Sequence, residues 1–181
     1  MRVKKNLRVA AVAVILVFAT AMLCGCTVKA EKGEGGIVPD GYKMVSAYGS
    51  TLYFPPNYNF AHTTEGVRYY TFAGGNANII ESEGSKVTSM KKWMYQLSLK
   101  NEFKRQGYDA DVNVAAYKYY ELSGLLILYT EVIVRLDSRT VYEYQIVYNA
   151  GDKQVTVTLA YEDKAPSEEV PYNILHSVSL K

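Results

Sequence analysis

The chain has 181 residues, with 20 Lys and Arg against 18 Asp and Glu, and four of the basic residues stand among the first eight. Without that segment, 16 basic residues remain against 18 acidic ones, a net charge of −2, which lacks the basic excess that a nucleic-acid backbone requires of its partner. Both cysteines, Cys24 and Cys26, stand near the N-terminus, so the rest of the chain can form neither a disulfide nor a thiolate metal site.

The N-terminus has the charge and length pattern of an export signal. An apolar run, Val9–Leu23, is interrupted only by Thr20 and follows a short basic segment. The run is shorter than the roughly 20 apolar residues that a spanning helix needs. An uncleaved membrane anchor that continues through Cys26 remains the alternative. The basic residues before the run are Arg2, Lys4, Lys5 and Arg8.

The four residues Leu23-Cys24-Gly25-Cys26 resemble the lipobox of bacterial lipoproteins, although Cys24 stands where that family more often has Ala or Ser. The resemblance implies that a signal peptide, residues 1–25, is cut between Gly25 and Cys26 and that a diacylglyceryl group is attached to the Cys26 sulfur. Two or three acyl chains hold a protein stably on a membrane. We therefore expect an exported protein on the outer face of the cytoplasmic membrane, or on the outer membrane if the source has two.

A flexible tether is expected after the lipidated cysteine, over residues 26–41. Its main part, Lys29–Gly41, is rich in Gly and charge and has no hydrophobic periodicity. A flexible coil of that length has a root-mean-square span of about 20 Å. The remaining residues, 42–181, are enough for one hydrophobic core and predict a single globular domain.

The first half of this domain predicts short strands. Tyr42–Phe54 is typical of one or two strands, which Pro55-Pro56 ends because proline cannot donate to a sheet ladder. Val67–Ala73 and Ala77–Glu83 are two further strands, and the Gly-rich connection between them indicates a hairpin.

One amphipathic helix of about 18 residues is then predicted, from Thr88 or Ser89 to Gly107. The residues expected to pack on the sheet are Met90, Trp93, Met94, Leu97 and Phe103. The basic residues are expected to point around the helix rather than along one stripe: Lys86, Lys91, Lys92, Lys100, Lys104 and Arg105.

From Asp111 the hydrophobic period changes from 3.6 to 2, which predicts an antiparallel meander of four strands. The second strand is apolar on both faces, so we expect it in the middle of the sheet. A second helix, Ser167–Ser177, is needed to cover the other face of the sheet. The four strands are Val112–Leu122, Leu125–Leu136, Thr140–Asn149 and Lys153–Glu162.

The order of these elements, closing with Ile174–Val178, resembles the sandwich of the PsbP subunit of photosystem II, of a Ran-binding nuclear-transport factor and of many bacterial lipoproteins. The resemblance implies an α+β fold of the PsbP-like α/β/α type, an antiparallel sheet of about six strands with helices on both faces. No functional residue of those families matches a numbered position here, so the resemblance implies a fold and no activity.

Residues for catalysis are scarce. The two histidines, His62 and His176, are expected to be surface or packing residues, and no nucleophile or phosphate-loop motif occurs. Glu81 and Glu83 share one face of a strand and are the best candidates for carboxylate catalysis. Asp109 and Asp111 could offer oxygen ligands to Ca²⁺ but lack the other ligands of a calcium loop. We predict no catalytic residue, no cofactor and no metal site.

Three functions remain open. The favoured one is a lipid-anchored, non-catalytic binding or accessory domain whose partners are the membrane, through the lipid at Cys26, and an envelope protein. The second is a carrier of a sugar, peptide or metabolite in a Tyr-lined groove between the helix and the sheet, since all 17 tyrosines follow residue 41. The third is an envelope hydrolase that uses Glu81 and Glu83.

Overall fold

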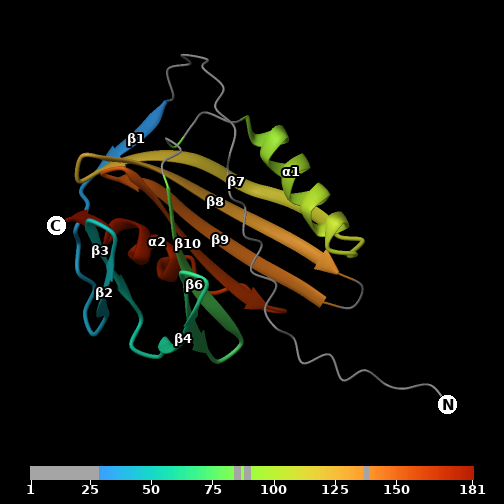
Figure 1. Cartoon of the computed structure of the whole chain (residues 1–181), viewed down its shortest axis with the longest axis horizontal. Coiled ribbons are helices and arrows are strands. Elements are labelled where there is room, and N and C mark those ends of the chain that lie inside the picture. Colours follow the sequence, from blue (N-terminus) through green and yellow to red (C-terminus); the bar gives the residue numbers. More distant parts are fainter. Residues whose placement is uncertain (1–28, 84–86, 88–90, 137–138) are drawn as a thin grey trace.

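The computed structural model describes residues 29–83, 87, 91–136 and 139–181 (Figure 1), and the predicted signal peptide and Cys26 lie outside these ranges. An eight-stranded sheet forms the middle of the molecule. In order across the sheet, its strands are β1 (Ala30–Gly33), β7 (Asp111–Leu122), β8 (Leu125–Leu136), β9 (Arg139–Ala150), β10 (Lys153–Glu162), β6 (Gly75–Glu83), β5 (Val67–Phe72) and β4 (Asn59–Thr64).

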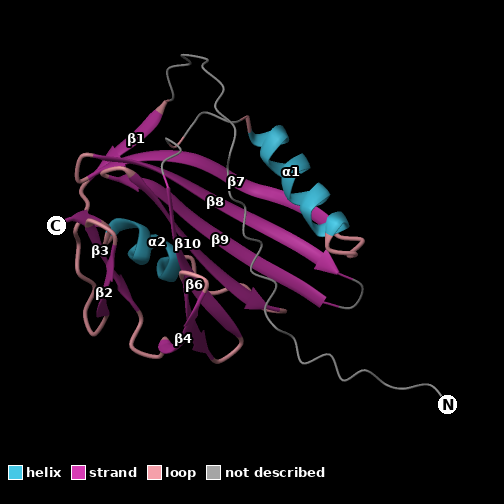
Figure 2. Ribbon diagram, viewed as in Figure 1, coloured by secondary structure: helices cyan, strands magenta, loops and turns pink. Residues whose placement is uncertain are grey.

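Two layers cover this sheet (Figure 2). The helix α1 (Lys92–Arg105) packs on one face, over β7 and β8. The helix α2 (Glu169–His176) packs on the other face together with a three-stranded sheet. The order of strands in that small sheet is β11 (Ser179–Leu180), β3 (Ser50–Phe54) and β2 (Lys43–Ala47).

The predicted meander is confirmed, because β7, β8, β9 and β10 pair antiparallel in sequence order, with β8 inside the sheet. Its first turn, Ser123-Gly124, has φ values of 50° and 74°, and positive values at both positions are those of a type I′ hairpin turn. Along β10, Val155, Val157 and Leu159 are fully buried on the side of α2. The alternation read from the sequence therefore sets which side of the sheet each residue faces.

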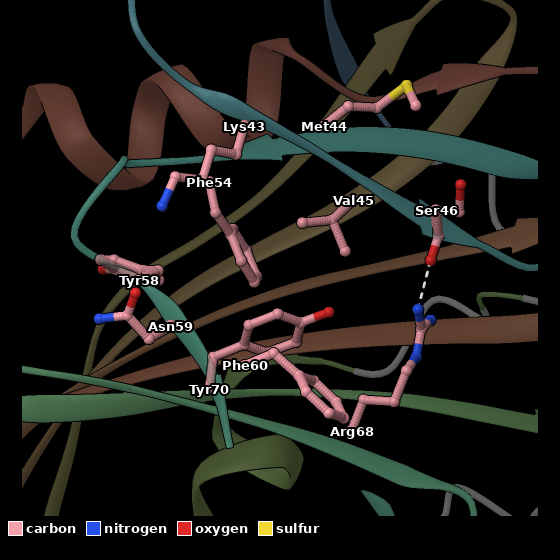
Figure 3. Close-up of a pocket in the computed structure, with 10 residues that line it drawn as sticks. All are labelled: Lys43, Met44, Val45, Ser46, Phe54, Tyr58, Asn59, Phe60, Arg68 and Tyr70. Atoms are coloured by element: carbon pink, nitrogen blue, oxygen red, sulfur yellow. Dashed lines mark hydrogen bonds between the residues drawn. The ribbon is translucent and has the colours of Figure 1, made fainter. Parts of the chain in front are cut away.

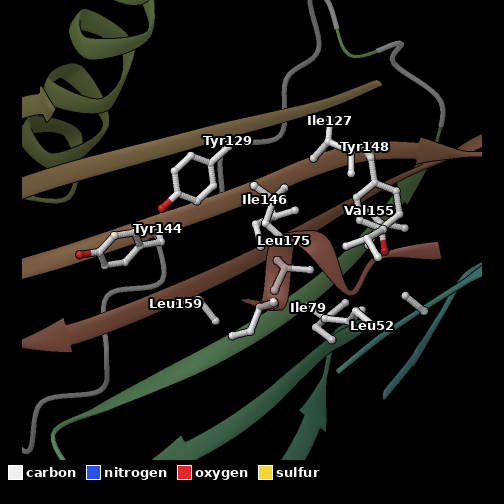
Figure 4. Packing of buried hydrophobic residues seen from close by; sticks show 14 of the residues in the cluster. Leu52, Ile79, Ile127, Tyr129, Tyr144, Ile146, Tyr148, Val155, Leu159 and Leu175 are labelled. Carbon is white, nitrogen blue, oxygen red and sulfur yellow. The ribbon is translucent and has the colours of Figure 1, made fainter. Parts of the chain in front are cut away.

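The main core lies between the large sheet and the layer formed by α2 and the small sheet (Figure 4). Leu175 of α2 is fully buried against it, as are Ile174 and Val178. Leu52 of β3 enters the same cluster from the small sheet.

The expectation of about six strands was wrong, since the large sheet has eight among the described residues. Two edge strands account for the difference. The segment of β4 is exposed at every position and shows no apolar face, and β1 is only four residues long with no hydrophobic alternation. Sequence patterns of period 2 depend on one buried face, so strands without such a face leave no signal.

The largest difference from the predictions concerns the expected flexible tether, because part of it is held against the domain. β1 pairs in parallel with β7, so the chain joins the sheet from Ala30 onward. Gly36 N donates to Val178 O at 3.2 Å, Ile37 N donates to His176 O at 3.0 Å, and the His176 ring contacts Glu34 O at 3.0 Å. These contacts fix residues 30–37, here called the N-terminal strap. Only residues 27–29 separate Cys26 from the strap.

The predicted buried face of the first helix was right for Phe103 and wrong for Trp93 and Leu97. Tyr95, Leu99 and Phe103 are the buried residues, at successive i, i+4 positions, whereas Trp93 is 62 % and Leu97 50 % exposed. The helix begins at Lys92, and the predicted start at residue 88 or 89 lies outside the described residues. In the part of the chain that the structure describes, neither helix is long and apolar enough to cross a membrane.

Candidate binding groove

A groove with a volume of about 370 Å³ opens between the edges of the two sheets (Figure 3). β2 is the outer strand of the small sheet, and β4 is the outer strand of the large sheet beside β5. Side chains from these strands and from the ends of β3 form its walls, and we call it the β2–β4 groove. Its lining residues are Lys43, Met44, Val45, Ser46, Phe54, Tyr58, Asn59, Phe60, Arg68 and Tyr70.

The floor of the groove is aromatic and fixed by packing. Phe54 contacts Tyr58 at 5.2 Å and Tyr70 at 5.0 Å between ring centroids, and all three residues are buried. Offset and edge-on ring pairs of this kind stabilise one arrangement of the side chains. At the rim, Met44 is 61 % and Phe60 59 % exposed. The groove thus offers a rigid apolar floor and two exposed apolar side chains above it.

The tyrosines of the floor stay protonated. Burial raises the pKa of Tyr58, whose hydroxyl is hydrogen-bonded to that of Tyr161, and burial also raises the pKa of Tyr70. Burial raises the pKa of Tyr161 to about 12. These hydroxyls are therefore neutral hydrogen-bonding groups at physiological pH and are not bases.

Arg68 links the two sheets across the groove. Its Nη1 donates to the Ser46 carbonyl on β2, as Figure 3 shows, and its Nη2 lies 2.6 Å from Glu81 Oε1 on β6. Glu81 Oε1 also accepts a hydrogen bond from Tyr48 N at 3.1 Å. The other cation, Lys43, donates to the Pro56 carbonyl at 2.6 Å and is exposed. Because the charge of Arg68 is paired with Glu81, the exposed Lys43 is the lining residue that favours an anionic group in the groove.

The residues singled out in the sequence do not gather at one site. Glu81 is held in the ion pair with Arg68, and Glu83 is exposed at the end of β6. His62 of β4 stacks on Tyr69 at 4.7 Å, whereas His176 is buried at the end of α2.

The expected calcium ligands likewise do not form a cluster. Asp111 pairs with Arg135 at 3.1 Å, and Asp109 is exposed. Among the described residues, no group of three or more His, Cys, Asp or Glu side chains could hold a metal ion.

The predicted groove between the helix and the sheet was placed wrongly. Tyr95, Leu99 and Phe103 fill that interface, packed against valines of β7 and β8. The β2–β4 groove was missed because β4 was not predicted as a strand, so no sequence pattern indicated that two sheet edges meet. The only available signal was the concentration of aromatic residues on either side of Pro55-Pro56.

The layers define a PsbP-like fold, with one helix on each face of a sheet that is antiparallel except for the parallel pairing of β1 with β7. The solved structure of cyanobacterial PsbP (CyanoP) from Synechocystis sp. PCC 6803 matches with a TM-score of 0.57 and 13% identity, over 81% of this chain and 96% of that one. A mutant of the protein Mog1 matches with a TM-score of 0.53 and 11% identity, over 77% of this chain and 95% of that one. Neither the family models nor the curated proteins give a match. At these identities the likeness establishes the fold alone.

Proposed function

We propose that this protein is a lipid-anchored component of the cell envelope whose non-catalytic domain binds an extended segment of a partner protein in the β2–β4 groove. The observation that carries the proposal is the position of the groove. It lies between two outer strands and combines a buried aromatic floor with Lys43 and Arg68. The segment would be apolar or aromatic, with an acidic side chain or a C-terminal carboxylate beside Lys43.

Outer strands suit an extended peptide because their free backbone groups can pair with it, while alternate side chains enter pockets. Phe60 and Met44 stand exposed at the rim, where they can close over a bound chain. A binding role requires no acid, base or nucleophile, which agrees with the neutral tyrosines and the paired Glu81. We therefore propose no enzymatic activity.

A small-ligand carrier is the second candidate, and the volume of the groove supports it. About 370 Å³ lies within the range of small-molecule sites, roughly 300–1,000 Å³. A sugar ring could stack on the same aromatic floor. The groove lies between the sheets, however, and not beneath α1 where the sequence placed such a site.

Panning a displayed library of random linear peptides against the immobilised protein tests the peptide proposal. We expect enrichment of sequences with aromatic and acidic residues. Phe60→Ala and Lys43→Glu should each weaken binding of a selected synthetic peptide at least about fivefold, the loss expected from an apolar contact or a charge pair of about 1 kcal/mol.

Leu126→Ala is the matched control, since Leu126 is also exposed but lies on β8 outside the groove. Equal affinity of the selected peptide for wild type and Phe60→Ala would contradict the site. A library without enriched sequences, combined with a thermal shift on adding sugars, would favour the small-ligand carrier.

The lipid anchor is tested by the intact mass of the protein purified from its native membrane. We expect the mass of residues 26–181 plus a diacylglyceryl group, and loss of that lipid in Cys26→Ala. Cys24→Ala is the control and should keep the lipid, because the lipobox resemblance places the acyl group on Cys26. A full-length unmodified chain would instead show that Val9 onward spans the membrane.

A further inference from the structure

The outward face of α1 carries an apolar and basic stripe. Trp93, Leu97, Lys100 and Lys104 are all exposed and stand at positions i, i+4, i+7 and i+11, which share one side of a helix. This side is opposite to the buried face of Tyr95, Leu99 and Phe103. We call these four residues the α1 stripe. Lys100 and Lys104 share this side, whereas Lys92 and Arg105 point to other sides of the helix.

The charge of α1 differs from that of the rest of the chain. The helix holds four basic residues and one acidic residue, Glu102, a net charge of +3, whereas the chain without its first eight residues carries −2. Glu102 accepts hydrogen bonds from Arg105 at 2.6 and 2.9 Å, so its charge is already paired. A Trp and a Leu beside lysines on one helix face is the composition of helices that lie at an anionic membrane interface.

The N-terminal strap brings this face close to the expected lipid. Ala30 pairs with Tyr119 of β7, and Lys92 at the start of α1 donates to Ala115 O of the same strand at 3.4 Å. Tyr119 and Ala115 are four residues apart, about 13 Å along a strand. Cys26 precedes Ala30 by four residues in the sequence, and a chain segment of that length spans at most about 14 Å. In Figure 1 both β1 and α1 begin toward the top of the view.

We propose that the α1 stripe is a second membrane contact, in which Trp93 and Leu97 enter the interface and Lys100 and Lys104 bind anionic lipid headgroups. The proposal rests on the lipid anchor for its geometry and does not depend on the β2–β4 groove. A juxtamembrane lysine contributes roughly 1 kcal/mol to binding at an anionic membrane surface. The two lysines together therefore strongly raise the fraction of molecules whose α1 contacts the membrane. The contact would orient the domain with α1 toward the bilayer.

Trp93 reports on this contact directly because it is the single tryptophan of the chain. The full lipidated protein is reconstituted into vesicles of phosphatidylcholine, alone or mixed with phosphatidylglycerol, with brominated phosphatidylcholine as the quencher. We expect Trp93 emission to be blue-shifted and quenched in the anionic vesicles only. Lys100→Glu combined with Lys104→Glu should remove most of this quenching. The matched control is Lys164→Glu with Lys181→Glu, the same charge change at exposed positions away from α1, and it should keep the quenching.

Three results would overturn the proposal: no quenching in either vesicle, equal quenching in both, or a blue shift without quenching, which would mean that a protein covers Trp93. If the intact mass shows no lipid, the chain is added to preformed vesicles and the same quenching is measured. Quenching of Trp93 in the unlipidated chain would then support the membrane contact of the α1 stripe even though the lipid anchor is disproved. If no quenching is seen, the membrane contact is disproved as well.

Discussion

Replacing Glu143 with Gln is expected to stabilise the protein at pH 8 by up to about 3 kcal/mol, because a shift of one pKa unit corresponds to 1.36 kcal/mol. Glu143 is 2 % exposed on the face of β9 toward α1, and burial raises its pKa from 4.5 to about 7. Its hydrogen bond comes from Gln145 Nε2, and Gln145 Oε1 in turn accepts from Tyr95 of α1 at 2.7 Å. A glutamine keeps an acceptor for this bond and removes the buried charge.

The direction in which the stability changes with pH follows from proton binding by Glu143. Between about pH 4.5 and pH 7 the folded protein keeps a proton on Glu143 that the unfolded chain has released. This group therefore stabilises the fold less as the pH rises through that window, and the full penalty is present above pH 7. Glu143→Gln should remove this part of the pH dependence, so wild type and variant should be nearly equally stable at pH 4.5 and differ most at pH 8.

Chemical denaturation of the purified full chain at a series of pH values measures the effect. Glu83→Gln is the control, since Glu83 is exposed at the end of β6 and its replacement should leave the curve unchanged. A Glu143→Gln variant that is less stable than wild type at pH 8 would show that the carboxylate is held by interactions stronger than its burial cost.

Leu99→Ala is expected to destabilise the protein by about 3 kcal/mol, whereas Leu97→Ala should change the stability by less than about 0.5 kcal/mol. Leu99 is 1 % exposed and packs with Tyr95 and Phe103 against valines of the sheet, so its truncation leaves a cavity. Leu97 is 50 % exposed on the opposite side of the helix.

The two variants remove the same atoms from positions two residues apart in one helix and are controls for each other. Urea unfolding followed by circular dichroism gives both free energies. Equal losses, or a larger loss for Leu97→Ala, would mean that α1 packs with the face expected from the sequence and would also remove the basis of the α1 stripe.

The face of α1 shows what a sequence pattern cannot decide. Trp93, Met94 and Leu97 have helical spacing and are more apolar than Tyr95. Counting apolar residues on each side of the helix therefore predicts burial of the side that carries Trp93 and Leu97, which is exposed in the structure. Tyr95 is buried because its hydroxyl finds Gln145 and Thr130, residues of β9 and β8 far along the chain. Burial of a polar group depends on such distant partners, and these become known only with the fold.

The strands were predictable where one or both faces are buried. The four-strand meander, the β5–β6 hairpin and the apolar residues of α2 follow from local periodicity and turn residues. The two outer strands and the groove were not predictable in this way. The groove is lined by Lys43 of the small sheet and Phe60 of the large sheet. The pairing of segments distant in sequence brings these two residues to the same groove.

The parallel pairing of β1 with β7 determines how force applied to the lipid would reach the domain. A pull on Cys26 is transmitted through three residues to Ala30 and then into the ladder between Ala30–Gly33 and Tyr119–Leu122. Under a pull directed along the strands, the hydrogen bonds of this ladder would share the force. At the end of the strap, Gly36 N is hydrogen-bonded to Val178 O and Ile37 N to His176 O, and these bonds would resist the same pull. With the proposed lipid on Cys26, the domain would be mechanically coupled to the membrane through its own sheet.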